Sequence, residues 1–184
     1  MLKKLNSLAI CIICLLLFTG CASKKMNEIP LVKQVDLAQF MGDWYVIAVI
    51  PTAIETEAYN PVENYKLNDD GTIATTFTFN KGSFDGKTKK YEPKGFVRPD
   101  TGNALWGMQF IWPIKAEYRI SYLDEAYQTT IIARNARDYV WLMARTPQIS
   151  DAEYGKLVAL ITSWDYDTKK LIKVPQQTLA ERKK

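Results

Sequence analysis

The chain has 184 residues, of which 47% are hydrophobic, 12% aromatic and 24% charged, so it suits one globular domain and excludes disordered, collagen-like and multi-span membrane chains. It contains no histidine, which excludes Ser-His-Asp and Cys-His catalytic groups, histidine-bound zinc or copper and histidine-ligated haem. The net charge of +4 is too small to favour nucleic acid as a partner.

The first twenty residues have the pattern of an export signal. Two lysines precede an uninterrupted apolar run at 8–18, and small residues follow it. Such a run is too short to cross the roughly 30 Å hydrocarbon core of a bilayer as a helix. A basic start, an apolar middle and a small-residue end are typical of a signal peptide. We therefore predict that residues 1–20 are a targeting segment and not part of the fold.

The end of this segment, Leu17-Phe18-Thr19-Gly20-Cys21, resembles the lipobox of bacterial lipoproteins, although Phe18 replaces the usual leucine. The resemblance implies that Cys21 is acylated and holds the protein on a membrane. Ala22, in place of aspartate, resembles lipoproteins sorted to the outer membrane, where we expect the domain to face the periplasm. Residues 21–31 would then be the acylated start and a polar tether. A plain secretory signal that leaves Cys21 as a free thiol is the alternative.

From residue 36 onward, after a short turn at 36–41, the sequence predicts one strand after another. The segments are rich in β-branched and aromatic residues, and short polar, glycine-containing or proline-containing connections separate them. Eight such segments occur, at 42–49, 62–67, 73–79, 90–97, 103–111, 116–123, 128–134 and 139–144. A meander of eight antiparallel strands closes into a barrel because closure removes both exposed edges. We predict an all-β, up-and-down antiparallel β-barrel.

After the eighth segment the apolar periodicity changes from that of a strand to that of a helix. Ser150 and Glu153 have capping-box spacing. Apolar residues then recur at i, i+3, i+4 and i+7, namely Tyr154, Leu157, Val158 and Ile161. We expect one amphipathic helix at 151–163, packed on the outside of the barrel. A short strand at 171–174 would complete a domain spanning 32–177, with a polar tail at 178–184.

Three motifs resemble those of lipocalins, in particular the bacterial, apolipoprotein D-like branch. Gly42-Asp43-Trp44-Tyr45 resembles the G-x-W motif, Arg137-Asp138-Tyr139 the second motif, and Trp141-Leu142-Met143-Ala144-Arg145-Thr146-Pro147 the third. The resemblance implies that Trp44 plugs the closed end of the barrel and that Arg145 lies over its indole face. It also implies structural roles for Asp138 and Tyr139, which we leave out of the ligand set.

The interior of such a barrel is lined by alternate residues of each strand. The apolar members of these alternations predict a ligand-binding set of Tyr65, Phe77, Phe79, Phe96, Trp106, Met108, Phe110, Tyr118, Ile120, Tyr122, Trp141 and Met143. Aromatic rings with a few hydroxyl groups suit a long apolar molecule with one polar end. We expect the segment 51–61 to cover the open end, as the first loop does in lipocalins. Arg98, Arg119 and Arg134 are expected to be solvated surface charges, and contact with a ligand carboxylate or phosphate at the mouth is the alternative.

One segment, Gln109-Phe110-Ile111-Trp112-Pro113, resembles the Ser-Phe-Phe-Gly-Pro stretch of lipocalins, with Trp112 in place of glycine. In related lipocalins this place is near other subunits or the bilayer. The resemblance therefore implies that an exposed Trp112 is an interfacial anchor, and it leaves a homodimer open. Packing of Trp112 on the helix or on a loop is the alternative.

Together these features predict a non-enzymatic lipoprotein that carries or stores hydrophobic molecules in the cell envelope, with no metal and no cofactor. The resemblance to lipocalins and the expected location imply that these molecules are fatty acids or lysophospholipids. Two alternatives stay open. Aromatic rings that fill the barrel completely would make the chain a structural or partner-binding envelope protein. An enzyme acting on lipid would need a positioned acid, base or nucleophile, and the sequence shows no recognisable constellation of that kind.

Overall fold

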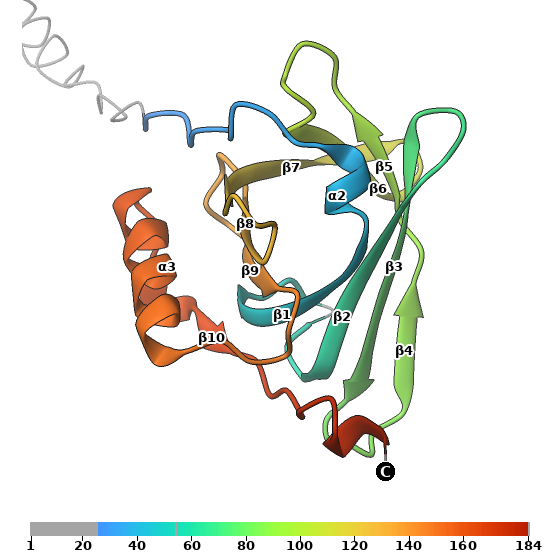
Figure 1. Cartoon of the computed structure of the whole chain (residues 1–184), viewed down its shortest axis with the longest axis vertical. Helices are drawn as coiled ribbons and strands as arrows, with labels where there is room; N and C mark the ends of the chain where they lie inside the picture. Colours follow the sequence, from blue (N-terminus) through green and yellow to red (C-terminus); the bar gives the residue numbers. More distant parts are fainter. Residues whose placement is uncertain (1–25, 54, 184) are drawn as a thin grey trace, which may run out of the picture.

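The computed structural model describes residues 26–53 and 55–183, so the predicted signal peptide and the lipidation predicted at Cys21 lie outside the described residues. One antiparallel sheet closes on itself where its first and last long strands pair (Figure 1). Its strands are β1 (Gly42–Ile50), β2 (Ala58–Leu67), β3 (Thr72–Lys81), β4 (Thr88–Tyr91), β5 (Lys94–Val97), β6 (Leu105–Ile111), β7 (Ile114–Leu123), β8 (Thr129–Ala133), β9 (Val140–Ala144) and β10 (Ile172–Lys173). The described helices are α2 (Leu37–Phe40) and α3 (Asp151–Ser163), with 3₁₀ turns η1 (Thr168–Lys170) and η2 (Glu181–Lys183).

Strands β4 and β5 together occupy one position in the barrel. Both strands pair with β3. Strand β4 pairs with it near Phe77, and β5 pairs with it near Ile73. Pro93 lies between them and has no N–H to donate, so the ladder is interrupted there, and its carbonyl accepts from the Thr75 N–H at 3.1 Å. With β4 and β5 taken as one strand, the barrel has eight antiparallel strands in chain order, which confirms the predicted fold class.

Strand β2 begins four residues earlier than predicted. Pro61 suggested a strand start at Val62, yet the pairing with β3 continues back to Ala58. The register shifts between Tyr59 and Val62, and Asn60 has a positive φ of 53°. Proline is accepted inside a strand at such a bulge because no ladder N–H is needed there.

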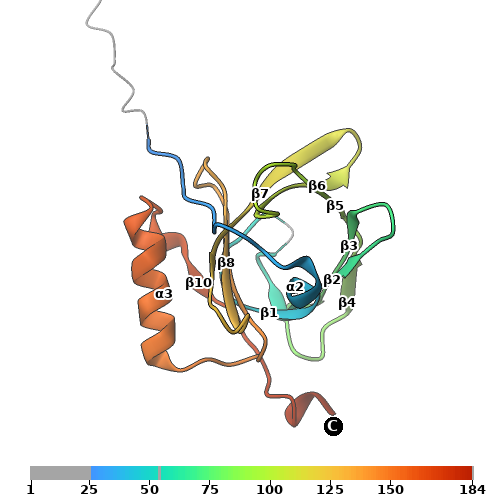
Figure 2. The same cartoon turned by 45° about the horizontal axis from the view of Figure 1, so that its top comes forward.

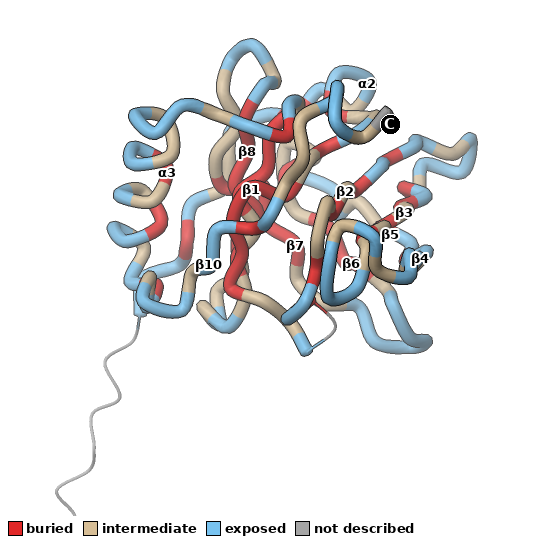
Figure 3. The backbone as a smooth tube through the Cα atoms, turned by 90° about the horizontal axis from the view of Figure 1, so that it is seen from below, coloured by how far each residue is buried: buried red, intermediate tan, exposed pale blue. Residues whose placement is uncertain are grey.

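Helix α3 has the predicted bounds. The Ser150 hydroxyl accepts from the Glu153 N–H at 3.2 Å and caps the first turn. Leu157 and Ile161 are buried on the outer face of the barrel, against β1, β8 and β9 (Figure 1). No helix in the described ranges is long and apolar enough to span a membrane. Buried residues concentrate on the strands, and exposed residues on the loops and on the side of α3 away from the sheet (Figure 3).

Helix α2 closes one end of the barrel, where it lies inside the ring of strands (Figure 2). The Trp44 indole N–H donates to the Phe40 carbonyl at 2.8 Å, and Trp44 is fully buried. The Arg145 guanidinium lies 3.9 Å from the centroid of the Trp44 ring and donates to the carbonyls of Asp43 and Gln39. This geometry confirms the predicted plug and its covering arginine.

The N-terminal segment packs on the outside of the barrel instead of forming a free tether as far as Leu31. Ile29 is 1% exposed, and its N–H donates to the Asn135 side chain at 2.9 Å. The Arg119 guanidinium donates to the Ile29 carbonyl and forms ion pairs with Glu117 at 2.7 Å and Glu28 at 3.0 Å. The expectation that Arg119 is a solvated charge is therefore wrong, because this segment covers it.

The C-terminal tail also returns to the barrel. The Gln176 amide donates to the Val46 carbonyl at 2.8 Å and to the Pro61 carbonyl at 2.9 Å. The Arg182 guanidinium lies 5.0 Å from the Tyr45 ring centroid. These contacts attach the predicted polar tail to the outer face of the sheet.

Candidate functional site

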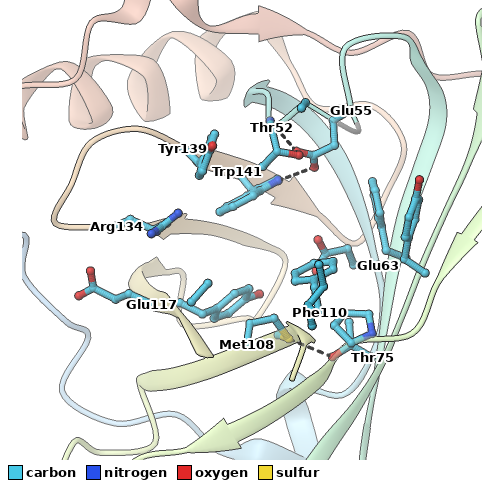
Figure 4. A pocket seen from close by; sticks show the side chains of 17 residues that line it. Thr52, Glu55, Glu63, Thr75, Met108, Phe110, Glu117, Arg134, Tyr139 and Trp141 are labelled. Carbon is cyan, nitrogen blue, oxygen red and sulfur yellow. Dashed lines mark hydrogen bonds between the residues drawn. The ribbon is translucent and has the colours of Figure 1, made fainter. Parts of the chain in front are cut away.

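The half of the barrel away from Trp44 is hollow. It contains a cavity of about 450 Å³, within the range of small-molecule sites in proteins (Figure 4). Strands from around the barrel and the β1–β2 loop contribute to its wall. The lining residues are Thr52, Ala53, Glu55, Glu63, Thr75, Phe77, Tyr91, Pro93, Met108, Phe110, Ile111, Ala116, Glu117, Tyr118, Arg134, Tyr139 and Trp141.

The other half is filled, and its packed rings form the floor of the cavity. The Phe40 ring lies 5.0 Å from the Trp44 ring and 5.5 Å from the Trp106 ring, centroid to centroid. Trp106 in turn stacks on Tyr118 at 5.1 Å. The alternative of a filled barrel is therefore wrong for the half away from Trp44, while it describes the half that contains Trp44.

The twelve predicted lining residues divide into three groups. Those that line the cavity are Phe77, Met108, Phe110, Tyr118 and Trp141. Those that point inward but belong to the packed core beside or beneath the cavity are Tyr65, Phe79, Trp106, Ile120 and Met143. Those that lie outside the barrel are Phe96 and Tyr122, and their assignment to the interior is wrong.

Phe96 lies outside because its neighbour Gly95 faces inward. A side chain at Gly95 would place its Cβ atom 3.1 Å from the Cβ atom of Ile73 and 3.5 Å from the Trp106 ring. The Trp106 indole thus already occupies the space that Phe96 was expected to fill. Phe96 instead packs under Lys115, whose Nζ lies 3.5 Å from the ring centroid.

Tyr122 lies outside because β7 contains a bulge. Ile120 pairs with Ile132, whereas Tyr122 pairs with Ile131, so Ser121 is an extra residue in the ladder. One extra residue inverts the alternation of side chains from that point on. Tyr122 therefore belongs to the outer apolar cluster beneath α3.

The loop between β1 and β2 covers part of the cavity, as expected, but it ends before Ala58, where β2 begins. Glu55 anchors it to the wall: this carboxylate is 5% exposed and accepts from the Trp141 indole N–H at 2.7 Å. It also accepts from the backbone N–H and the hydroxyl of Thr52. The hydrogen bonds of Glu55 thus fix the loop to Trp141 in the barrel wall and hold it over the opening.

Glu63 is a buried acid in the cavity wall that the sequence reasoning missed. It is 9% exposed and accepts a hydrogen bond from the Tyr65 hydroxyl, which lies 2.6 Å from the Tyr118 hydroxyl. Burial raises the pKa of Glu63 to about 8, and the nearby Glu55 charge acts in the same direction. Glu63 has the same strand parity as Tyr65, so the alternation contained the signal, but only apolar residues were selected from it.

Arg134 also lines the cavity, although it was expected to be a solvated charge. Its side chain is 21% exposed and its Nη1 atom lies 3.1 Å from the Asp138 carboxylate. Its Nε atom is buried and has no hydrogen-bond partner among the described residues. Tyr139, which was left out of the ligand set, lines the cavity beside it, while Arg98 is exposed as expected.

An exposed apolar patch lies at the tip of the β6–β7 hairpin, next to the cavity opening. The exposed fractions are 51% for Phe110, 71% for Ile111, 82% for Trp112 and 67% for Ile114. Phe110 and Ile111 belong to both the patch and the cavity lining. Trp112 therefore does not pack on the helix or on a loop.

The described residues contain no group of three or more histidine, cysteine, aspartate or glutamate side chains arranged to hold a metal ion. The chemistry that the cavity lining offers is apolar contact, three carboxyl groups, one guanidinium and a few hydroxyls. Such an interior suits an amphiphile that buries its apolar part.

Comparison with known protein families and solved structures agrees with the fold described above. A model of the lipocalin-like domain matches residues 35–176. Among solved structures, insecticyanin from the tobacco hornworm Manduca sexta superposes with a TM-score of 0.64 at 16% identity, covering 84% of this chain and 87% of that one. This likeness shows a shared fold.

Several relatives are similar over most of their length. Temperature-induced lipocalin-1 of Arabidopsis thaliana is 31% identical over 164 residues, 82% of this chain and 84% of that protein. The outer membrane lipoprotein Blc of Citrobacter freundii is 29% identical over 163 residues, 87% and 90% of the two chains. Apolipoprotein D of Bos taurus is 27% identical over 150 residues, 77% of each. The chain belongs to the lipocalin family, in the branch that includes Blc and apolipoprotein D.

Proposed function

We propose that this protein is a lipid-anchored lipocalin that binds and carries or stores hydrophobic molecules, such as fatty acids or lysophospholipids, at the outer membrane. The cavity of about 450 Å³ between Phe77, Met108 and Trp141 carries this proposal. Burial of apolar surface at about 25 cal/mol per Å² supplies affinity for such ligands without directed chemistry. The role is binding and not catalysis, as is general among lipocalins.

The membrane location is supported by two observations. The relatives named Blc are described as outer membrane lipoproteins, and the sequence before Cys21 resembles a lipobox. The first described residues lie at the open end of the barrel, where Arg137, in the β8–β9 loop, donates to the Asn27 carbonyl at 2.5 Å. Five residues separate Cys21 from Asn27, and extended chain spans at most about 3.5 Å per residue. An acylated Cys21 would therefore keep the cavity opening close to the periplasmic surface of the membrane.

The apolar patch at Phe110, Ile111, Trp112 and Ile114 fits this orientation. Tryptophan is enriched where protein meets the membrane interface, because its ring is apolar and its N–H is polar. A hairpin tip that rests in the lipid surface would place the cavity opening against the source of its ligands. A second copy of the chain covering the same patch is the alternative, and chemical crosslinking of the full-length protein distinguishes the two.

Lipid extraction tests the binding role. The full-length protein is expressed with its own N-terminal segment, purified in detergent and extracted for mass spectrometry. We expect co-purifying lipid in the wild type and much less in Met108→Trp, which fills the cavity. A wild-type barrel that contains no lipid and takes up no fluorescent fatty acid would remove the carrier role and favour a structural envelope protein.

The anchor is tested separately by the intact mass of the same preparation. We expect a diacylglycerol-sized addition on the wild type, and none on Cys21→Ser. An unmodified Cys21 in a protein that still binds lipid would keep the binding role and remove the anchor.

A further inference from the structure

The charged groups of the cavity are unevenly distributed. Its described lining contains three carboxyl groups, at Glu55, Glu63 and Glu117, and one guanidinium, at Arg134. Glu117 is paired with Arg119 on the outer face, at 2.7 Å, so it does not act inside. The interior is therefore left with two carboxyl groups, at Glu55 and Glu63, and one cation, the Arg134 guanidinium.

The Arg134 cation already has a carboxylate partner. Arg134 is paired with Asp138, and its guanidinium lies 5.2 Å from the Tyr139 ring centroid. Arg134 and Glu63 extend from different walls toward the same space (Figure 4), and no ion pair between them occurs in the described part of the chain. Within residues 26–53 and 55–183, Glu63 thus has no cation paired with it to balance its ionised form.

The two acids differ in what they still offer to a ligand. Glu55 already accepts hydrogen bonds on both oxygens, from Trp141 and from Thr52. Glu63 accepts its one described hydrogen bond, from Tyr65, on Oε2. Its Oε1 atom has no hydrogen-bond partner among the described residues, so it is the acceptor that a ligand group can use.

An unbalanced carboxyl group in an apolar enclosure selects ligands by charge. An ionised carboxylate is costly to bury alone, and a cation bound beside it repays that cost through an interaction that low dielectric strengthens. A second carboxylate placed beside it would add repulsion, unless one of the two acids keeps a proton. Because the Tyr65 hydroxyl donates to Glu63, the Tyr118 hydroxyl donates to Tyr65, and the Tyr118 oxygen can still accept a hydrogen bond from a bound ammonium group.

We propose that Glu63 is a recognition site for an ammonium group, so that the cavity prefers amphiphilic amines to carboxylates of the same chain length. The inference rests on the proposed binding function and narrows its ligand class. The apolar part of the ligand would contact Phe77 and Met108, and the ammonium group would lie at Glu63 and Tyr118.

Binding of this kind moves a proton. Because burial holds the pKa of Glu63 at about 8, the carboxyl group is mostly protonated at neutral pH. An ammonium ion stabilises the ionised form, so Glu63 releases its proton to the buffer when the ligand binds. A primary amine stays protonated to about pH 10, so the ligand does not titrate in the same range. Among the described residues, the titratable groups that face Glu63 are Tyr65 on β2, Tyr118 on β7 and Glu55 on the β1–β2 loop, and Arg134, which follows β8, extends toward the same space.

Three ligands of equal chain length test the proposal: octylammonium, octanol and octanoate. Their binding to the full-length chain in detergent is followed by quenching of tryptophan emission, with detergent blanks, from about pH 6 to about pH 9. We expect octylammonium to bind about tenfold more tightly at the upper end than at the lower, and octanoate to weaken over the same range. Calorimetry at neutral pH in two buffers of different ionisation enthalpy should show proton release with octylammonium and none with octanol.

Glu63→Gln supplies the test of the residue, because glutamine keeps the shape and removes the charge. We expect it to weaken octylammonium about tenfold, to abolish the pH dependence and to change octanol binding much less than octylammonium binding. Glu57→Gln is the matched control: it removes a nearby carboxylate whose side chain is 61% exposed and paired with Lys81 at 3.8 Å. Melting temperatures report whether each variant folds.

The outcomes separate this inference from the binding function itself. If none of the three ligands binds, the proposed function fails as well. If octanol and octanoate bind but octylammonium is neither preferred nor sensitive to pH, the ammonium site is overturned while the carrier role stands. A preference for octanoate that is lost in Arg134→Gln would place an anion site at the guanidinium instead. If Glu63→Gln does not fold, the pH dependence of ligand binding by the wild type still tests the ammonium site.

Discussion

The two halves of this barrel are built from the same strands but serve different purposes. On β6, Trp106 and Met108 are consecutive inward residues, and both are almost fully buried. Trp106 lies in the filled half, between Phe40 and Tyr118, whereas Met108 borders the cavity. The difference arises because α2 inserts Phe40 at one end, while the β1–β2 loop covers part of the other.

This contrast shows that alternation along a strand determines which side chains point inward, but not whether they form a core or a cavity wall. A floor residue is surrounded by other side chains on all sides. A wall residue has an unfilled space on one side, so it contributes fewer contacts to stability and more to a ligand.

The largest effect should come from truncating the floor. Trp106→Ala should lower the free energy of unfolding by about 3 to 5 kcal/mol, because it opens a void among packed rings. Met108→Ala, one inward position further along β6, should cost about 2 kcal/mol, near the lower limit for such truncations, since it enlarges an existing space. Urea unfolding of both variants measures the difference, and equal losses would contradict the division into floor and wall.

Glu63→Gln should change how stability depends on pH. The pKa of Glu63 in the folded protein, about 8, lies above the ordinary value of 4.5. The folded state therefore holds a proton that the unfolded chain has lost between these two values. Stability of the wild type should fall as pH rises through this window, by at most about 1.4 kcal/mol per pH unit, and level off above it.

In the variant this decline should be absent. Thermal unfolding at several pH values, for wild type and Glu63→Gln side by side, gives the comparison. A wild type whose stability does not fall across this window, with a pH profile that matches that of Glu63→Gln, would show that Glu63 is ionised in the folded protein.

Gly95→Val should cost about 1 to 3 kcal/mol through overpacking of the floor. The added Cβ atom would lie 3.1 Å from the Ile73 Cβ atom, and the branched methyl groups would press on Trp106. Gly107→Val is an informative counterpart: its Cβ atom would also lie 3.1 Å from a Cβ atom, that of Lys115, but on the outer face, where the neighbouring side chain can move into solvent. Denaturant midpoints should fall more for Gly95→Val, and a reversed order would mean that Gly95 does not face the interior.

Trp112→Ser should have the smallest effect on stability, within about 0.5 kcal/mol, since the side chain is 82% exposed. Binding of the full-length protein to phospholipid vesicles should nevertheless weaken if the patch rests in the membrane surface. A variant with unchanged vesicle binding but a lower crosslinked-dimer yield would assign the patch to contact between copies of the chain.

Much of the fold was predictable because its signals are local. The Ser150 cap and the apolar spacing of α3 need no distant contact, and its bounds agree with the prediction. The motifs around Trp44 and Arg145 specified the closed end correctly. Interruption of one strand at Pro93 also has a local cause, although the prediction treated 90–97 as continuous.

The interior was predicted less well because its signals are not local. Phe96 was assigned to the wall by strand alternation, yet Trp106 from the next strand leaves room there only for Gly95. Tyr122 was misplaced by the bulge at Ser121, which exists only in the pairing with β8. Glu63 was overlooked because a carboxyl group is not expected inside a barrel on the basis of its polarity alone.

The amino-acid sequence alone determined the barrel, the outer helix and the plug at the closed end, because periodicity, caps and short motifs act over a few neighbouring residues. Only the tertiary structure decided where packing stops and the cavity begins, and that an acid lies in its wall. Those features depend on volumes and charges contributed by strands far apart in the chain, which no single segment of sequence contains.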